Sequence, residues 1–95
     1  MGSKNEIRYG SGFFKDASKL PRQAREKLAL LIVILEENPF DSRLHTKQLS
    51  QPLQDMYSFR ITRDWRAIFQ FIDNGIQLIA ADHRSKIYQR LKRLL

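Results

Sequence analysis

The turn Asp73-Asn74-Gly75, between two stretches in which apolar and polar residues alternate, constrains the fold of this chain most strongly. Asn-Gly is the preferred pair for a two-residue hairpin loop, because both positions require a positive φ. The sequence therefore predicts a β-hairpin with strands over 65–72 and 76–83. With Asn74-Gly75 as the loop, the cross-strand pairs would be Asp73 with Ile76, Phe71 with Leu78, Phe69 with Ala80, and Arg66 with His83.

A further alternating stretch, over residues 57–62, predicts a strand that pairs with the first strand of the hairpin. For the aromatic side chains of both strands to share the core face, Ile61 must lie near Trp65. That register sets Arg60 beside Arg66, and it directs Trp65 into the core. We therefore expect Arg60, Arg66 and His83 to converge on the sheet face that the helices leave uncovered.

The first third of the chain has the pattern of a short strand followed by a helical hairpin. Residues 6–9 form a short strand, a glycine turn follows, and residues 13–20 have helical spacing. Pro21 suits the first turn of a second helix, which Asn38-Pro39 ends. The apolar run 28–35 offers more apolar surface than one sheet covers, so it is either a well-buried core helix or a core helix with a stripe left for a partner helix or a second copy.

The chain ends in a basic amphipathic helix within residues 85–95, with Ile87 and Leu91 on one side and Lys86 and Arg90 on the other. The basic side is either an ordinary solvated face or a source of phosphate attraction. Together these elements predict one α+β domain over residues 1–95: an N-terminal strand, a helical hairpin, a three-stranded antiparallel sheet and a short C-terminal helix.

The charge of the chain limits its partners. A formal net charge of +7 in 95 residues gives a field that attracts polyanions, such as nucleic acid or an acidic protein. The polar, irregular segment 40–52 adds Arg43, His45 and Lys47, and it is a candidate for substrate or partner contact.

Several function classes are disfavoured by what the sequence lacks. It has no cysteine, which is compatible with a reducing cytoplasm, and its two histidines are far apart, so we expect no zinc site. No glycine-rich phosphate loop or dinucleotide fingerprint is present, and we expect no cofactor. The longest apolar run has eight residues, too short for the ~20 that a membrane span needs.

Three stretches in order carry a resemblance to a known family. They are Leu35 with Asn38-Pro39, the run from Leu49 through Pro52-Leu53 to Tyr57–Phe69, and His83-Arg84-Ser85-Lys86-Ile87-Tyr88. In wording and spacing they resemble the RelE/ParE toxin superfamily from about residue 13 onward. The resemblance implies a toxin that cuts mRNA in the ribosomal A site without a metal, and a cognate antitoxin protein that wraps and blocks it.

The resemblance also implies site residues. Arg66 matches the arginine that holds the scissile phosphate, Arg60 a basic residue of the preceding strand, and Arg84 and Tyr88 the arginine and tyrosine of the terminal motif. Related members use a histidine close to His83. We take Arg66, His83, Arg84 and Tyr88 as catalytic candidates, and as RNA-binding candidates Arg60, Lys47, Arg63, Lys86 and Arg90.

These residue types suit metal-free RNA cleavage, which needs a proton acceptor for the 2′-hydroxyl, cations for the phosphorane and a proton for the leaving oxygen. Guanidinium groups bind phosphate oxygens two at a time, and imidazole titrates near neutrality. The alternative is structural: an arginine of the pair would bind Asp64 or Asp82, His83 would be a structural strand-end residue, and Tyr88 would close the core.

Two departures from the family pattern leave the activity open. Ser58 stands where RelE-type toxins carry a lysine, and Asp82 where they carry a further arginine. ParE-type members share the fold but inhibit DNA gyrase, so the resemblance alone does not establish nuclease activity. A gyrase inhibitor and a weakly active or inert member remain as alternatives.

Overall fold

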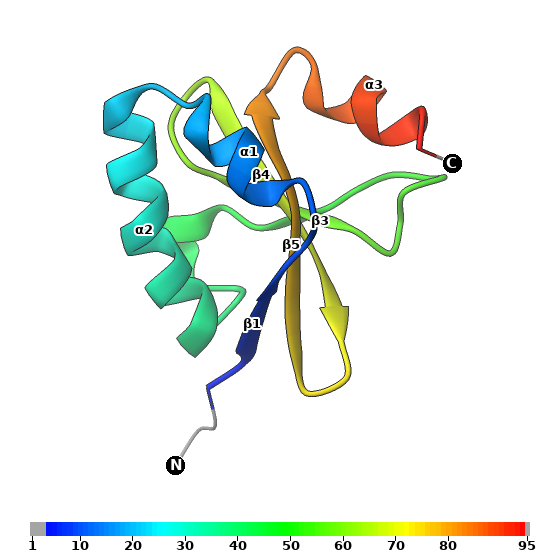
Figure 1. Cartoon of the computed structure of the whole chain (residues 1–95). Coiled ribbons are helices and arrows are strands. Elements are labelled where there is room, and N and C mark those ends of the chain that lie inside the picture. Colours follow the sequence, from blue (N-terminus) through cyan, green and yellow to red (C-terminus); the bar gives the residue numbers. More distant parts are fainter. Residues whose placement is uncertain (1–3, 95) are drawn as a thin grey trace.

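The computed structural model describes residues 4–94, and these form an α+β domain built on one sheet (Figure 1). The element order confirms the predicted strand, helical hairpin, antiparallel strands and short C-terminal helix. In chain order the elements are β1 (Glu6–Tyr9), α1 (Phe13–Ser18), α2 (Arg22–Glu37), the 3₁₀ helix η1 (Ser42–Leu44), β2 (Lys47–Gln48), β3 (Tyr57–Arg60), β4 (Trp65–Ile72), β5 (Gly75–His83) and α3 (Ile87–Lys92).

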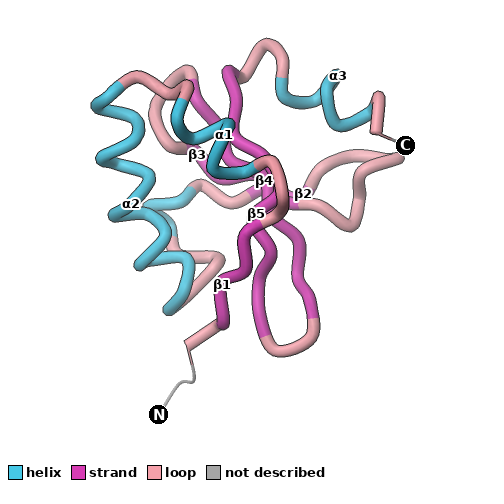
Figure 2. Tube along the Cα trace, viewed as in Figure 1, coloured by secondary structure: helices cyan, strands magenta, loops and turns pink. Residues whose placement is uncertain are grey.

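The sheet is larger than the three strands expected from the alternating pattern. Its five strands lie in the order β1-β5-β4-β3-β2, and the central three pair antiparallel, as predicted. β1 adds to β5 in parallel, and the two-residue β2 adds to the free edge of β3 (Figure 2). A strand as short as β2 carries no periodicity of its own, so only the structure reveals it.

The predicted loop Asn74-Gly75 is wrong by one residue. Ile72 pairs with Gly75, so the two-residue loop is Asp73-Asn74, and of these only Asn74 has a positive φ, 65°. Gly75 meets a different need, because a Cβ at this position would lie 2.2 Å from the backbone oxygen of Glu6 in β1. Glycine is therefore required by the close approach of β1 and not by the turn.

A β-bulge between Ile68 and Phe69 changes the register again, and it also changes the face on which partners meet. Because the loop comes one residue earlier than predicted, each residue of β4 pairs with a β5 residue two positions away from the predicted one. A shift of two residues alone would leave the partners on the predicted face of the sheet. The bulge takes up one residue, so beyond it the predicted parity is reversed. Phe71 pairs with Ile76, Phe69 with Leu78, Ile68 with Ala80, Arg66 with Asp82 and Trp65 with His83, which makes the predicted pairs Phe71–Leu78, Phe69–Ala80 and Arg66–His83 wrong.

Helices α1 and α2 cover one face of the sheet and bury the main core (Figure 1). From α2 this core takes Ala24, Leu28, Leu31 and Leu35, which recur at helical spacing. Leu30 and Val33 point away and are 68% and 53% exposed. The helix is thus a core helix that also leaves an apolar stripe uncovered. None of the helices within residues 4–94 has the length and apolar character of a membrane span.

From the sequence we expected the helices to leave the opposite face of the sheet uncovered. In the structure, α3 packs against part of it. Ile87 and Leu91 of α3 are buried in a second apolar cluster with Leu49, Leu53, Ile68 and Ala80. Ile68 and Ala80 are cross-strand partners, and they lie on the face opposite to the adjacent pair Ala67 and Ala81, which belongs to the main core. The remainder of this face, near Arg60 and Arg66, is where the site lies.

Candidate functional site

Arg60 and Arg66 are cross-strand partners on β3 and β4, as the sequence predicts. Side chains of directly opposed residues in an antiparallel pair lie on the same face, so the two guanidinium groups stand together. The acidic partners considered for them are engaged elsewhere: Asp64 lies 3.5 Å from Arg84 and Asp82 lies 3.2 Å from Arg90. Within residues 4–94, neither arginine of the pair makes an ion pair with a carboxylate.

Arg66 is held by the turn that joins β3 to β4. Its Nη1 atom donates to three backbone oxygens, those of Thr62, Arg63 and Trp65, at 2.8, 2.9 and 3.2 Å. Burial and then the neighbouring charge of Arg60 lower the pKa of Arg66, so its cationic form is electrostatically crowded. A cation fixed in this way, without a carboxylate partner, is prepared to receive an anion.

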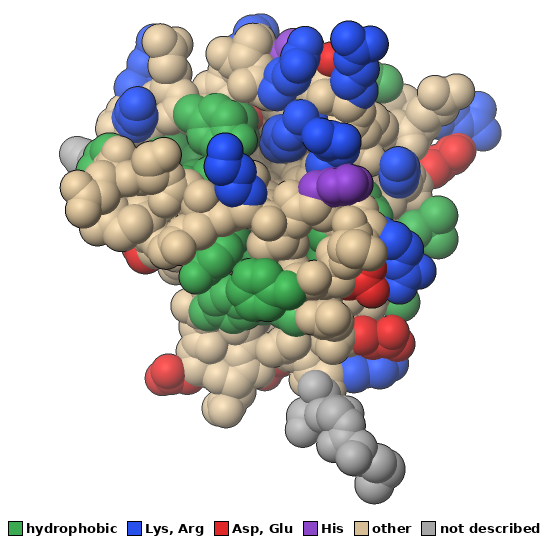
Figure 3. Space-filling model, turned by 180° about the vertical axis from the view of Figure 1, so that it is seen from behind, with side chains coloured by type: hydrophobic (Ala, Val, Ile, Leu, Met, Phe, Trp, Pro, Cys, Tyr) green, Lys and Arg blue, Asp and Glu red, His purple; other side chains and the backbone are tan. Residues whose placement is uncertain are grey.

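Both arginines open into one small cavity of about 240 Å³. Its lining comes from four parts of the chain and consists of His45, Lys47, Ser58, Arg60, Arg66 and Tyr88. Three of these are permanent or usual cations, and there is no carboxylate among the six. The face turned away from the viewer in Figure 1 accordingly shows Lys and Arg side chains gathered over its upper half (Figure 3).

His45 lines the cavity, although the sequence analysis named it only as part of the contact segment 40–52 and not as a site residue. It follows η1, whose Leu44 is fully buried and whose Asp41 carboxylate accepts the backbone N–H of Arg43. Its own backbone is left-handed, with φ at 51°, and the hydroxyl of Thr46 beyond it donates to the Pro39 oxygen. Anchors on both sides therefore hold the segment that carries His45, whose exposed side chain lines the cavity. Segment 40–52 was a predicted contact region, but a loop has no period from which the direction of His45 could be read.

Lys47 supplies the positive charge that Ser58 does not. Ser58, which stands where RelE-type toxins carry a lysine, is 4% exposed and pairs directly with Lys47 of β2. The ammonium group therefore enters the cavity from the neighbouring strand instead of from β3. Lys47 thus lies beside the arginine pair because of the unpredicted strand β2, and its contact with RNA stays a prediction.

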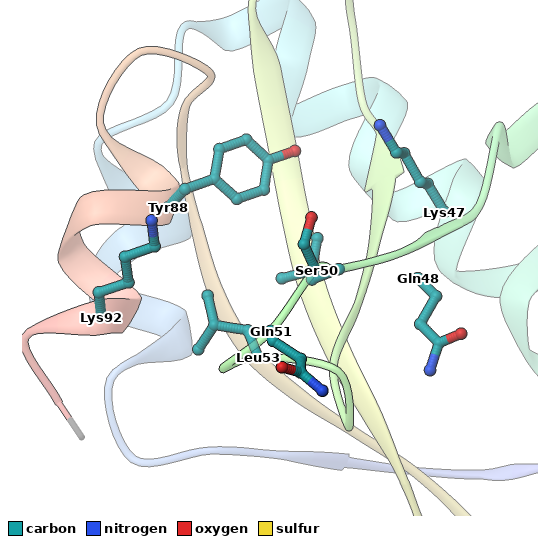
Figure 4. Close-up of a pocket in the computed structure, with 8 residues that line it drawn as sticks. Lys47, Gln48, Ser50, Gln51, Leu53, Tyr88 and Lys92 are labelled. Carbon is teal, nitrogen blue, oxygen red and sulfur yellow. The ribbon is translucent and has the colours of Figure 1, made fainter.

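Tyr88 lines this cavity and also a second one of about 260 Å³, which shares Lys47 with the first. Figure 4 shows the second cavity between α3 and the segment that follows β2, with the Tyr88 ring directed across it. The buried side chains of Leu49 and Leu53 give it apolar surface, and Gln48 and Gln51 add amide groups. Tyr88 thus faces the cavities and does not close the core.

His83 lies apart from this cavity, which corrects the predicted convergence with Arg60 and Arg66. Because the bulge reverses the parity, His83 pairs with Trp65 and its ring meets the Trp65 ring edge-on at 5.3 Å. Its Nδ1 lies 2.8 Å from the Ser85 hydroxyl and accepts the Ser85 backbone N–H at 3.1 Å. Trp65 packs against the main core, as predicted.

The remaining predicted residues do not line this cavity. Arg84 is exposed beside Asp64, and its charge helps to lower the pKa of Arg66 after the larger effects of burial and Arg60. Arg63 is exposed on the β3–β4 turn, where its backbone oxygen accepts from Arg66. Lys86 and Arg90 instead line a separate polar hollow beside α1. Arg90 is held there by two carboxylates, Asp16 and Asp82.

The chemistry available in the cavity is that of anion binding with proton transfer. Two guanidinium groups and one ammonium group can surround a phosphate, and an imidazole and a phenol can exchange protons at its edge. In the part of the chain that the structure describes, no three acidic, histidine or cysteine side chains group as metal ligands.

Comparison with known proteins supports the fold through structure, not through sequence. No protein-family model matches the sequence, and the search of curated proteins finds no match. The structure is similar to that of YafQ from Escherichia coli (TM-score 0.74, 18% identity, 90% of this chain and 99% of that one). It is also similar to the YoeB/ParE toxin from Agrobacterium tumefaciens (TM-score 0.71, 17% identity, 83% of this chain and 98% of that one).

A third similar structure comes from an antitoxin–toxin complex, that of RelB and RelE from Methanococcus jannaschii (TM-score 0.72, 19% identity, 87% of this chain and 96% of that one). The matches span nearly the full length of each of these proteins, and they agree with the fold that the sequence resemblance implied. This chain therefore has the RelE-like toxin fold.

Proposed function

We propose that this chain is the toxin of a toxin–antitoxin pair and that it cuts mRNA in the ribosomal A site without a metal. The observation that carries the proposal is the cavity in which Arg60, Arg66, Lys47, His45 and Tyr88 meet. A fold of this kind supports more than one activity, so the argument rests on the site.

The cations of the cavity bind the scissile phosphate. Arg66, already anchored through Nη1, offers its remaining donors to one phosphate edge, and Arg60 offers a second fork from the adjacent strand. Lys47 adds a point charge from β2. Their combined charge is most favourable when the phosphorane carries two negative charges, so the transition state is bound more tightly than the substrate.

The proton transfers involve the two groups at the edge of the cavity. The imidazole of His45 takes the proton of the 2′-hydroxyl as O2′ bonds to phosphorus. The bond from phosphorus to O5′ breaks, and the hydroxyl of Tyr88 gives its proton to O5′, leaving a tyrosinate that Arg66 stabilises. The products are a 2′,3′-cyclic phosphate and a free 5′-hydroxyl, and exchange with water resets both side chains.

The second cavity suits a nucleobase next to the cut. It adjoins the phosphate cavity through Lys47 and Tyr88, and it combines the apolar surface of Leu49 and Leu53 with amide groups. Apolar walls bind the faces of a base and amides bind its edge. A substrate that presents a phosphate and its flanking base together would fill both cavities.

The proposed partner is a cognate antitoxin, by analogy with the complex that contains RelE. The net charge of +7 favours an acidic one. Because translating ribosomes are the proposed target, we place the activity in the cytoplasm.

Expression of the chain alone tests the proposal. We expect growth arrest, and we expect the 5′ ends of cellular messages to accumulate at fixed positions within codons. The variant Arg66→Ala should abolish both effects, while Arg22→Ala, which removes an exposed charge from α2, should not. Growth arrest with intact messages would contradict cleavage, and a DNA supercoiling assay would then test gyrase as the target.

A further inference from the structure

Arg90 joins three elements at the edge of the sheet. Its Nη2 atom lies 2.8 Å from both carboxylate oxygens of Asp16 in α1, and its Nη1 atom lies 3.2 Å from Asp82 in β5. The hydrogen bonds to Asp16 are the main reason why the pKa of Arg90 is raised. Arg90 itself belongs to α3, so this one side chain connects the last helix to the first helix and to the last strand.

Asp16 is buried, so leaving its charge unpaired would lower the free energy of unfolding. It is 8% exposed, and besides Arg90 it accepts only the backbone N–H of Ala81, at 3.1 Å, among the contacts of residues 4–94. That N–H lies on the edge of β5 beyond Leu78, where the pairing with β1 ends. The buried carboxylate therefore closes an open strand edge and depends on Arg90 for its charge balance.

Helix α3 needs such a restraint because it is only six residues long. Ile87 and Leu91 bury one stripe against the sheet, and two apolar contacts along one line permit the helix to roll about that line. At 3.6 residues per turn, Tyr88 and Arg90 project about 160° apart, on opposite flanks of the buried stripe. A tether on the Arg90 flank therefore determines how far Tyr88 turns toward the cavities.

We propose that Arg90 is a positioning residue, whose ion pairs with Asp16 and Asp82 fix the roll of α3 and so hold Tyr88 at the two cavities. This inference rests on the proposed function only for its effect on cleavage, since the placement of the Tyr88 ring can be measured without RNA. It gives Arg90 a role different from the RNA contact expected from the sequence.

A double-mutant cycle on RNA cleavage tests the effect. A misplacement of about 1 Å can reduce a rate about 100-fold, so we expect Arg90→Ala to lose most of what Tyr88→Ala loses. The double variant should be no slower than Tyr88→Ala alone. Arg93→Ala, which removes the same charge from the exposed end of α3, should cleave like the parent chain. Full additivity of Arg90→Ala and Tyr88→Ala would overturn the proposal.

Two milder variants guard against loss of folding. Arg90→Lys keeps the charge but not the fork, and Asp82→Asn weakens one ion pair while it leaves the buried pair with Asp16. Both should give intermediate rates with melting temperatures near that of the parent. Rates equal to that of the parent in both variants, together with a parental rate for any folded Arg90→Ala protein, would also overturn the proposal.

NMR of protein with labelled tyrosines separates this proposal from the nuclease itself. The ring resonances of Tyr88 should shift in Arg90→Ala and Arg90→Lys and remain in place in Arg93→Ala, whether or not the parent chain cleaves RNA. Shifted resonances with an inactive parent would reject the proposed function and retain the positioning role. Unchanged Tyr88 resonances in both Arg90 variants would reject the positioning role.

Discussion

Arg60 and Arg66 lie directly opposite each other on β3 and β4, with no carboxylate between them among the described contacts. Two like charges in this relation repel, and the lowered pKa of Arg66 records that repulsion together with the effect of burial. The three carbonyl oxygens around Nη1 of Arg66 compensate part of it. The negative charge of a bound phosphate group would relieve the rest, so the repulsion present in the free protein favours binding of an anionic ligand.

Substitution of Arg66 should separate charge from geometry. We expect Arg66→Ala to lower kcat/KM for cleavage in a purified ribosomal complex by about 100- to 1000-fold, the usual loss when one oxyanion donor is removed. Arg66→Lys keeps a cation but cannot hold three carbonyls and a phosphate edge together, so it should recover only part of the rate. Full activity in the lysine variant would show that charge alone matters.

The two histidines should behave differently. If the His45 imidazole accepts the 2′-hydroxyl proton, His45→Gln should slow cleavage by about 100-fold or more. His83→Gln should retain most of the activity, because His83 binds Ser85 and Trp65 away from the cavity. Cleavage rates of the two variants, measured under single-turnover conditions, check this. The opposite result would restore His83 as the acceptor.

Two leucines of α2 provide a matched test of the core. Leu35 is fully buried, whereas Leu30 is 68% exposed. We expect Leu35→Ala to lower the free energy of unfolding by about 2–5 kcal/mol through lost burial and an unfilled cavity. Leu30→Ala should change it by less than about 0.5 kcal/mol. Urea denaturation of both variants gives the comparison, and similar losses would contradict the orientation of α2.

Two glycines test how closely β1 approaches β5. In Gly75→Ala the new Cβ would collide with the Glu6 backbone, so we expect a loss of about 1–3 kcal/mol, typical of overpacking. Gly12 has open space around it and a negative φ, and Gly12→Ala should cost less. Thermal unfolding should show a clear difference, because about 1 kcal/mol moves the midpoint by about 4–8 °C in a domain of this size. Equal midpoints would mean that β1 is not held against Gly75.

The sequence predicted the elements well because their signals are local. Helical spacing in α2, the proline near its start and the alternation in β3 and β4 each act over a few residues. The pairing of Arg60 with Arg66 followed from the need to bury Ile61 and the aromatic residues on one side. Local patterns and one buried face were sufficient for these features.

The features that failed depend on contacts between distant segments. The bulge at Ile68/Phe69 leaves no residue signature, yet it moves His83 away from Arg66. We predicted Gly75 to be a turn residue because the sequence of the hairpin contains no sign that β1 approaches it closely. Likewise, His45 and Lys47 reach the cavity only because the segment before β3 folds back along it.

The parallel pairing of β1 with β5 has a consequence for how the protein is made. β1 spans Glu6–Tyr9, but its partner residues, Gly75 to Leu78, come much later in the chain. β1 therefore stays without this neighbour until residues 75–78 have been synthesised, and contacts of this long range form slowly. Tyr88 follows β5 in the chain, so the cavity that it lines can be completed only after residue 88 has been synthesised.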